Sequence, residues 1–571
     1  MSDVRLRRQA WLLIAIPVGI ALLGAWLYRW VDEDAFINFR IVANVVAGHG
    51  PVYNVGERVE TYSDPLWVAS LTAFQSIGPW VGIEWWSVIL GLGTTAGGMV
   101  LGGRGIQHLL DRDRDAGTTV PVGLVIFSVV AGVWQFITSG LEMGMVFLWL
   151  GLSFWLLVRL ADRRRNAGLP GFVIGLGVLI RPELIVMAAV LLTAVGILVG
   201  MPGWRGSTSF QGRWLQPLAA AAALPVAYEV WRMAYFAMLV PNTGLAKSAG
   251  SSWWSEGFDY LWNFLSPYTL WLAILLAVPL VALEVRHFAR HNDRVAIVVL
   301  ATPVIAALFD TVYVVKIGGD YMHARLLLPA FFALSLVIAV RIENLRTWIV
   351  VPTVAIGVWA IVCAGWLRNT ENGIDPIIIN SRNNSVALTH MANPITADDY
   401  EASVLGEVGQ GLHVVGTPPS EHGKRMFVGA FRSVPARSSL PFTVATASGT
   451  IGVVGYLAGP NVYIFDVVSL ANPIGSHTTS AVKLRPGHDK PISVVWMYAR
   501  FGVPGDSFGV DPQSVAEARQ AMACPPLRSY LHAITAPLTF GLAASNFVHS
   551  IGYTTMSFSA DPRQAVNQLC G

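Results

Sequence analysis

The sequence predicts a polytopic α-helical membrane protein of about eleven transmembrane helices, followed by a C-terminal extracytoplasmic α/β soluble domain. Three features of the composition lead to this fold class. Hydrophobic residues make up 54% of the 571 residues, charged residues make up only 13%, and the mean hydropathy is +0.54. A soluble globular surface needs more charge than this. The 21 tryptophans are typical of membrane interfaces, where amphipathic rings gather.

The first predicted span covers about residues 10–30 and is preceded by Arg5, Arg7 and Arg8. Because cytoplasmic segments carry the Lys/Arg excess, we expect the N-terminus inside. No small-residue cleavage site follows the apolar segment, so we interpret it as an anchor and not as a removed signal peptide. Residues 31–80 are mixed in character and are expected outside.

Further apolar segments are close to the length that crosses a hydrocarbon core, at about 82–103, 119–137, 142–160, 169–181, 183–201, 214–239, 261–283, 295–315, 325–341 and 347–366. In this topology every strongly basic loop falls on the inner side: Arg104, Arg112 and Arg114; Arg163, Arg164 and Arg165; Arg205 and Arg213; Arg286, Arg290 and Arg294; Arg341 and Arg346. The count therefore places everything after about residue 367 outside. We expect a transmembrane domain at 1–367 and a soluble domain at 368–571.

The predicted soluble domain is rich in Asn, Asp, Ser, Pro and Gly. Its short apolar runs Ile451–Tyr456 and Val462–Val468 lie between turn signals and predict strands. Cys524 and Cys570 both fall in this polar part, and a disulfide between them is permitted if the part is extracytoplasmic. The third cysteine, Cys363, lies in an apolar stretch and fits a buried thiol.

The net charge of +3 is small and spread out, so nucleic acid is not an expected partner. Polar residues instead gather in the outside loops. Asp32, Glu33 and Asp34 follow the first span directly. Three adjacent carboxylates repel one another, which raises the pKa of at least one of them. The alternative is a solvated helix N-terminus, where acidic residues are favoured by the helix dipole.

The same loop continues through 56–67, whose mixed charges, Pro65 and Trp67 also suit an interfacial amphipathic segment. The next outer loop, 138–142, ends at Glu142. A third is the turn Arg181-Pro182-Glu183, for which a buried ion pair that joins two spans is the favoured alternative.

The fourth outer loop, 239–247, contains Asn242 and ends at Lys247, and a lone lysine at a membrane surface usually snorkels. The fifth loop, 316–325, brings Asp320, His323 and Arg325 next to paired glycines that allow close backbone approach. Two candidate ligands, Asp320 and His323, do not make a metal site. Arg325, at the start of a span, suits an anion clamp.

Five polar clusters from distant parts of the chain are thus expected on one membrane face. They supply carboxylates in the first loop and cations in the fourth and fifth. An acid/base group together with a site for a phosphate-sized anion suits group transfer from a phosphate-linked donor.

The order of these motifs resembles the membrane-embedded GT-C glycosyltransferases, which use polyprenyl-phosphate sugars. The similarity is carried by the acid before Asp-Ala-Phe-Ile, the Gly-Glu-Arg-Val-Glu stretch ending in Pro65-Leu66-Trp67, Pro241 through Lys247, and Gly319-Asp320 through Arg325 with Pro329. It returns at 454–456 and 466–473. Within that class the chain looks closest to the terminal β-(1→2) arabinofuranosyltransferases of mycobacterial and corynebacterial cell-wall synthesis.

The resemblance implies transfer of arabinofuranose from decaprenyl-phosphate arabinofuranose to an arabinan-type glycan, on the outer face of the plasma membrane. Glu33 and Asp34 match the family's pair of aspartates. Glutamate at the first position is a departure, so the main catalytic role is expected of Asp34. Lys247, Arg325 and His323 are expected to bind the donor phosphate. Sugar or acceptor contacts are assigned to Arg58, Glu142, Asp320 and Asn242.

No metal site is predicted, although an acidic cluster leaves a divalent cation possible. A single displacement with one base inverts the anomeric centre, whereas retention would make Asp34 or Glu33 a nucleophile. A polyprenyl-phosphate mannose-dependent mannosyltransferase is the closest alternative. A lipid-linked sugar transporter, with mid-membrane charges and repeated halves, is disfavoured, and a glycan-binding scaffold is a third possibility.

Overall fold

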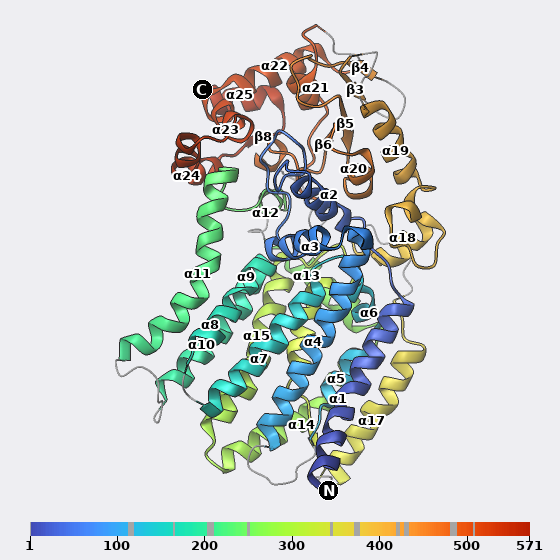
Figure 1. Ribbon diagram of the computed structural model, residues 1–571, viewed down its shortest axis with the longest axis vertical. Helices are drawn as coiled ribbons and strands as arrows, with labels where there is room; N and C mark the ends of the chain where they lie inside the picture. The colour runs from blue at the N-terminus through green and yellow to red at the C-terminus, as the bar shows by residue number, and fades with distance from the viewer. Residues whose placement is uncertain are drawn as a thin grey trace. The chain divides into compact units, whose positions relative to one another are not determined.

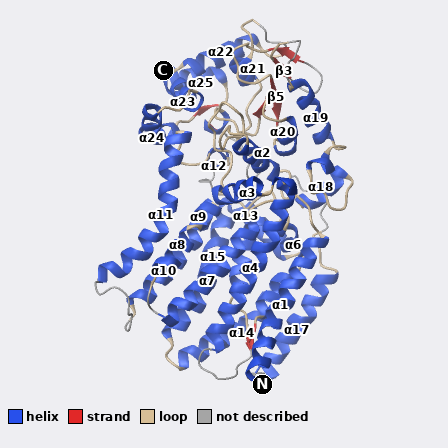
Figure 2. Cartoon of the chain, viewed as in Figure 1, coloured by secondary structure: helices blue, strands red, loops and turns tan. Residues whose placement is uncertain are grey.

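The computed structural model describes residues 2–111, 119–163, 166–201, 210–247, 252–342, 347–369, 377–417, 423–427, 433–479, 488–505 and 509–571. Helices predominate over strands in these ranges (Figure 2). The chain forms two compact units: unit 1 is Met1–Trp30, Ser87–Val226 and Ser252–Asn383, and unit 2 is Val31–Trp86, Ala227–Ser251 and Asn384–Gly571. Compactness is a different criterion from membrane crossing, so the division at residue 367 stays a prediction.

Within the described ranges, six helices are long and apolar enough to cross a membrane: Ala10–Leu27, Ile83–Asp111, Met143–Asp162, Pro182–Gly200, Leu270–Arg290 and Arg294–Ile317. They confirm the expected class of helical membrane protein. The count of eleven spans stays a prediction. Of the arginines used for the topology, residues 112, 114, 164, 165, 205 and 346 lie outside the described ranges.

Unit 1 contains most of the apolar helices (Figure 1). Its elements are α1 (Ser2–Leu27), most of α4 (Ile83–Asp111), α5 (Val122–Ser128), α6 (Ala131–Ile137), α7 (Met143–Arg163), α8 (Gly168–Gly175), α9 (Gly177–Ile180), η2 (Pro182–Leu184), α10 (Ile185–Gly200), part of α11 (Phe210–Phe236), α13 (Trp254–Leu265), α14 (Leu270–Arg290), α15 (Arg294–Ile317), η3 (Arg325–Leu327), α16 (Leu328–Ser335) and α17 (Thr347–Gly365). Helix α1 packs against α5 and α6, and α15 packs against α7, α10, α13, α14 and α16.

Glycines allow α4 and α7 to approach closely. A Cβ atom added to Gly98 of α4 would collide with the backbone of Phe147, and one added to Gly151 of α7 would collide with the backbone of Gly98. Small residues at such crossings are typical of helix packing in membranes, where no hydrophobic force drives helices together and close van der Waals contact replaces it.

Four of the predicted spans are interrupted. The segment 261–283 crosses from α13 (Trp254–Leu265) to α14 (Leu270–Arg290). Residues 119–137 form the separate helices α5 and α6, and 169–181 form α8 and α9. The segment 325–341 ends in strand β2 (Val340–Arg341), which pairs antiparallel with β1 (Thr119–Val120). Apolar composition alone did not reveal these breaks, because hydropathy measures burial or lipid contact and not helix continuity.

Unit 2 joins residues 31–86 to the C-terminal part. Its elements are α2 (Ala35–Val46), α3 (Pro65–Ile77), η1 (Pro79–Val81), the end of α11, α12 (Asn242–Ala246), most of α18 (Ser381–Thr389), η5 (Ala397–Tyr400), α19 (Val404–Gly416), β3 (Arg425–Phe427), β4 (Ser433–Pro435), β5 (Val444–Ser448), α20 (Gly452–Ala458), β6 (Val462–Asp466), η6 (Gly475–His477), β7 (Thr478–Thr479), α21 (Val495–Phe501), α22 (Pro512–Ala523), α23 (Pro525–Thr535), α24 (Phe540–Thr555), β8 (Phe558–Ser559) and α25 (Pro562–Cys570).

The C-terminal part contains a four-stranded sheet with the order β4-β3-β5-β6. Strands β3, β5 and β6 are parallel, whereas β4 is antiparallel to β3. The predicted strand at Val462–Val468 is confirmed as β6. The predicted strand at Ile451–Tyr456 is wrong, because these residues mostly form helix α20. Parallel β5 and β6 need a crossover connection, and α20 supplies it; a short apolar run cannot be assigned from periodicity alone.

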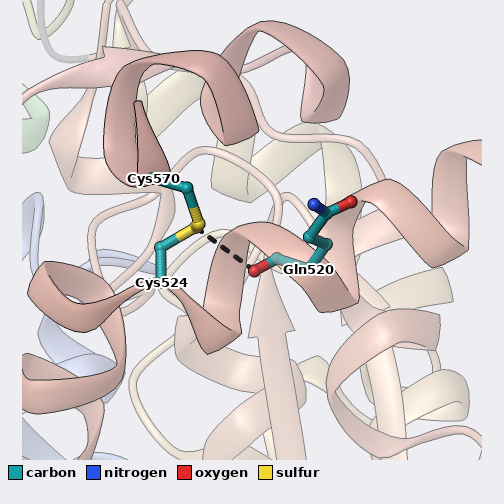
Figure 3. The surroundings of a disulfide bond; sticks show 3 residues. All are labelled: Gln520, Cys524 and Cys570. Carbon is teal, nitrogen blue, oxygen red and sulfur yellow. Dashed lines mark hydrogen bonds between the residues drawn. A yellow bond between two sulfur atoms is a disulfide. The ribbon is translucent and has the colours of Figure 1, made fainter.

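A disulfide joins Cys524 to Cys570, whose Cα atoms lie 5.1 Å apart (Figure 3). It connects the end of α22 to the end of α25, and these two helices also pack against each other. Cys363 is a free, buried cysteine in α17, as the sequence predicted.

Candidate active-site residues

The carboxylate loop, Asp32–Asp34, lies between the end of α1 and the start of α2, and all three residues belong to unit 2. The Asp34 amide donates to Asp32 Oδ1 at 2.9 Å, and the Ala35 amide donates to the Asp32 carbonyl at 3.1 Å. This local turn is characteristic of aspartate, whose side chain can replace a backbone acceptor. Asp32 is buried, whereas Asp34 is only partly buried. The turn therefore fixes the backbone of Asp34, a residue that is partly exposed.

Glu33 caps the start of helix α20, which packs against α2. Its Oε1 accepts from the backbone N–H groups of Gly452 at 2.5 Å and Val453 at 3.1 Å. Burial, together with the negative charges of Asp34 and Asp32, raises the pKa of Glu33 to about 8, even though the two N–H donors favour the charged form. A Cβ atom at position 452 would collide with the Glu33 carbonyl, so glycine is required there. Glu33 thus orders the carboxylate loop against α20.

Arg40 of α2 binds three backbone carbonyls in the same region. Its Nε donates to the Tyr53 carbonyl at 2.8 Å, one terminal nitrogen donates to the Val462 carbonyl at 2.7 Å, and the other donates to the Gly455 carbonyl. The side chain is buried. It joins α2 to α20 and β6, and sequence reasoning did not identify it.

Arg58, one of the predicted sugar-binding residues, binds three backbone carbonyls of unit 2. Its guanidinium donates to Ala533 at 2.7 Å, Ala536 at 2.8 Å and Tyr235 at 3.1 Å. These contacts connect the first outer loop to α23 and to the end of α11. All three guanidinium nitrogens of Arg58 donate to these carbonyls, so the side chain holds the three backbone segments together.

Asn242, the other predicted acceptor-binding residue of unit 2, binds the turn that follows β6. Its Nδ2 donates to the carbonyls of Leu470 at 2.8 Å and Ser469 at 3.1 Å. Asp466 closes the same turn by accepting from the amides of Val468 and Ala471, both at 2.8 Å. The motif at 466–473 therefore forms a rigid turn, to which the 241–247 motif is attached. Lys247 is partly buried at the end of α12.

In unit 1, an arginine cluster brings together residues from three predicted outer loops. Arg181 binds Glu142 Oε1 at 2.7 Å and Glu183 Oε1 at 2.6 Å. Arg325 approaches the same Glu142 oxygen at 3.9 Å and Asp320 Oδ2 at 3.6 Å. Glu142 and Arg181 are buried. Glu142 is therefore shared by two guanidinium groups, which is a geometry for holding cations close together.

The backbone of the Gly318–Arg325 loop is fixed before any ligand binds. Gly318 and Gly319 have φ values of 93° and 74°, which glycine adopts without the steric cost that other residues meet. The Tyr260 hydroxyl of α13 donates to the Met322 carbonyl at 2.9 Å and accepts from the Leu326 amide at 3.0 Å. One buried side chain thus links both ends of the turn before Arg325 enters η3.

His323 is buried beneath this loop and has a protein partner at each ring nitrogen. Its Nε2 lies 2.9 Å from the Tyr268 hydroxyl and its Nδ1 lies 2.6 Å from Asn263 Oδ1. Burial lowers the pKa of His323 to about 3. The arrangement fits a neutral ring protonated at Nδ1, which positions the loop and carries no charge for a phosphate.

The predicted site residues therefore fall in two groups. Unit 1 contains Glu142, Asp320, His323 and Arg325; unit 2 contains Glu33, Asp34, Arg58, Asn242 and Lys247. The ion pair favoured for the Arg181-Pro182-Glu183 turn is present, whereas Asp310, a buried acid in α15, was not predicted as a site residue. An ionisable residue inside an apolar span was the signal that could have found Asp310. Within the described ranges, no group of three or more His, Cys, Asp or Glu side chains could hold a metal ion.

The six long apolar helices found in the described part of the chain indicate a helical membrane protein. A family model described as the AftB family C-terminal domain matches residues 422–568. A terminal β-(1→2)-arabinofuranosyltransferase of Mycobacterium tuberculosis is 30% identical, with 98% of this chain and 96% of the relative covered. The enzyme of the same name from Corynebacterium glutamicum is 28% identical over 98% of this chain and 87% of its own.

The chain therefore belongs to the terminal β-(1→2)-arabinofuranosyltransferase family, and it is a glycosyltransferase. This confirms the resemblance proposed from the sequence motifs. No solved structure matches the chain.

Proposed function

We propose that the chain transfers arabinofuranose from decaprenyl-phosphate arabinofuranose to a cell-wall arabinan-type acceptor on the outer face of the plasma membrane, with Asp34 as the main catalytic carboxylate. The similarity to two named arabinofuranosyltransferases over nearly the whole chain carries the proposal. The donor, the acceptor and the side of the membrane are inferred from the motif resemblance and from the chemistry of the residues.

The contacts of the carboxylate loop support Asp34 over Glu33 as the reacting group. Glu33 is committed to the N–H groups of α20, and its raised pKa of about 8 keeps it largely protonated at neutral pH. A protonated carboxyl is neither a base nor a nucleophile. Asp34 and Glu33 are both partly exposed, so the choice of Asp34 rests on the bonds that commit Glu33 to α20 and on the motif resemblance.

In the proposed reaction, Asp34 accepts the proton of the acceptor hydroxyl as that oxygen forms a bond to the anomeric carbon. The bond from this carbon to the lipid phosphate oxygen breaks, and the phosphate leaves with the electron pair. The predicted cations Arg325 and Lys247 are the proposed partners of phosphate charge, since guanidinium and ammonium groups form charge-assisted hydrogen bonds to it. His323, neutral and bonded at both nitrogens, is reassigned to positioning the Gly318–Arg325 loop.

The Cys524–Cys570 disulfide supports an outer location for the C-terminal part. Disulfides form and persist in oxidising compartments and are rare in the cytosol. Two cysteines placed at the ends of packed helices α22 and α25 therefore fit an extracytoplasmic environment, which is also what the arginine distribution predicts.

The test is sugar transfer by the purified full chain in lipid nanodiscs. Synthetic polyprenyl-phosphate arabinofuranose and polyprenyl-phosphate mannose are offered separately with a short arabinan, and the product linkage is determined by NMR. Transfer of arabinose to give a β-(1→2) linkage supports the proposal. Transfer of mannose alone would replace it with the mannosyltransferase alternative, and the anomeric configuration of donor and product decides between inversion and retention.

A further inference from the structure

Helix α24 in unit 2 buries polar side chains and exposes apolar ones, which is the reverse of a helix on the surface of a soluble domain. Its buried positions are the polar residues Asn546 and Ser550, and its most exposed positions include apolar side chains. Phe540 is 92% exposed, Val548 71% and Ile551 57%. With Phe547 these residues form the apolar face of α24. An exposed apolar surface of this kind on a soluble protein marks an interaction site.

The polar side of α24 is used to attach the helix to unit 2. Asn546 Nδ2 donates to the carbonyls of Ala234 at 3.1 Å and Ala533 at 3.3 Å. The Thr554 hydroxyl accepts from the Leu239 amide at 2.8 Å. Figure 1 shows α24 beside the end of α11, in agreement with these contacts. These hydrogen bonds hold the polar side of α24 against unit 2, so the apolar face is directed outward.

The neighbouring surface continues this apolar character. At the end of α11 and just beyond it, Val230, Trp231 and Leu239 are exposed, and Leu538 is exposed immediately before α24. The charged residues of this stretch of α11, Glu229 and Arg232, form an ion pair with each other. From Ser529 to Ala560 the chain has no Asp, Glu, Lys or Arg. By contrast, exposed or partly exposed positions of α22 in the same unit carry Gln513, Glu517 and Arg519. A partner protein would be expected to meet some charge at its rim, whereas uncharged lipid needs none.

We propose that the apolar face of α24 lies in the lipid interface and anchors unit 2 to the bilayer surface. Phe540, Phe547, Val548 and Ile551 insert at the boundary between headgroups and acyl chains, which is the place that an amphipathic helix lying in the membrane plane occupies. Because the segment has no charged side chain, the contact depends on apolar burial and not on anionic headgroups. This inference does not depend on the donor, the acceptor or the catalytic residues.

The experiment uses the full chain reconstituted in phosphatidylcholine vesicles. Val548→Cys and, separately, Ile551→Cys are labelled with an environment-sensitive nitrobenzoxadiazole dye, and Ala516→Cys on exposed α22 is the matched control. The native free cysteine is buried and the other two form the disulfide. Spin-labelled phosphatidylcholine is the quencher. Each variant is first checked for a monodisperse profile and a thermal midpoint equal to that of the parent.

We expect blue-shifted emission and about twofold quenching by the lipid quencher at 548 and 551, with neither effect at 516, because only the α24 face would reach the acyl boundary. The signal is unchanged by high salt and by added anionic lipid. Red-shifted, unquenched emission at both positions would overturn the proposal. Blue-shifted emission that lipid does not quench would overturn it in favour of a second copy of the chain, and quenching that requires anionic lipid would exclude the uncharged mode of binding.

Discussion

The carboxylate loop of unit 2 and the arginine cluster of unit 1 solve the same problem, the placement of charge in a mostly apolar protein, in different ways. In the carboxylate loop, backbone N–H groups of Gly452 and Val453 compensate the carboxylate of Glu33 by donating hydrogen bonds to it. Around Arg181 the compensation comes from opposite side-chain charges on Glu142 and Glu183. The first arrangement leaves Asp34 partly exposed, whereas the second buries Glu142 and Arg181 and depends on every member being present.

The largest expected effect is on catalysis, and it separates Asp34 from its neighbour. Asp34→Asn should lower kcat by about 10²–10⁴-fold, the usual contribution of a positioned general base. Glu33→Gln keeps an oxygen acceptor for the α20 amides and should retain most of the activity. Single-turnover transfer measured on both variants checks this, and equal losses in the two would remove the distinction between them.

The next largest effect is on the stability of the arginine cluster. Arg181→Met leaves Glu142 and Glu183 buried without their cation, which typically costs about 3–5 kcal/mol. Arg290→Met, at an exposed position of α14, is the control and should change stability by less than about 0.5 kcal/mol. Thermal unfolding in nanodiscs compares them. Arg181→Met as stable as the control would mean that the cluster is solvated and that the contrast with unit 2 is wrong.

A smaller effect is expected at Tyr260, which orders the Gly318–Arg325 loop. Tyr260→Phe removes the hydroxyl that bonds Met322 and Leu326, at a cost of about 1–3 kcal/mol for buried groups left unsatisfied. Amide hydrogen exchange should accelerate in this loop and stay unchanged in the carboxylate loop. Acceleration in both loops would show that the two regions do not respond independently.

The two loops should also respond to pH in opposite directions. Glu33 has a folded-state pKa raised to about 8, so its neutral form is favoured by folding and stability falls as the pH rises from about 4.5 to 8. His323 has a folded-state pKa lowered to about 3, so stability rises with pH up to about 6.5. Glu33→Gln and His323→Gln should each flatten one slope. Thermal midpoints between pH 4 and 9 measure this, and parallel slopes in the variants and the parent would contradict it.

The smallest effect is expected at Lys247. Lys247→Gln removes one partly exposed cation, and its contribution should be about 0.2–1 kcal/mol, or up to a few-fold in KM for the lipid donor with little change in kcat. Steady-state transfer with varied donor, at low and high salt, checks this. A decrease in kcat without a change in KM would instead mean that Lys247 binds the reacting phosphate only in the transition state.

The sequence by itself determined the class of the protein and the places where its polar residues gather. Apolar composition, the arginine distribution and the motifs at 32–37, 241–247 and 319–325 are local properties, so they can be recognised without contacts. The same is true of the permitted Cys524–Cys570 pair, because both cysteines lie in one polar region.

Only the tertiary structure decided what each polar side chain does. Glu33 caps a helix 419 residues further along the chain, Arg58 and Asn242 brace backbone turns, and His323 is neutral because it is buried. Residues 451–456 became mainly a helix because two parallel strands required a crossover. A side chain's partners and its burial come from contacts between distant segments of the chain. Those contacts determine its charge and its role, whereas the local sequence pattern determines only where along the chain the residue lies.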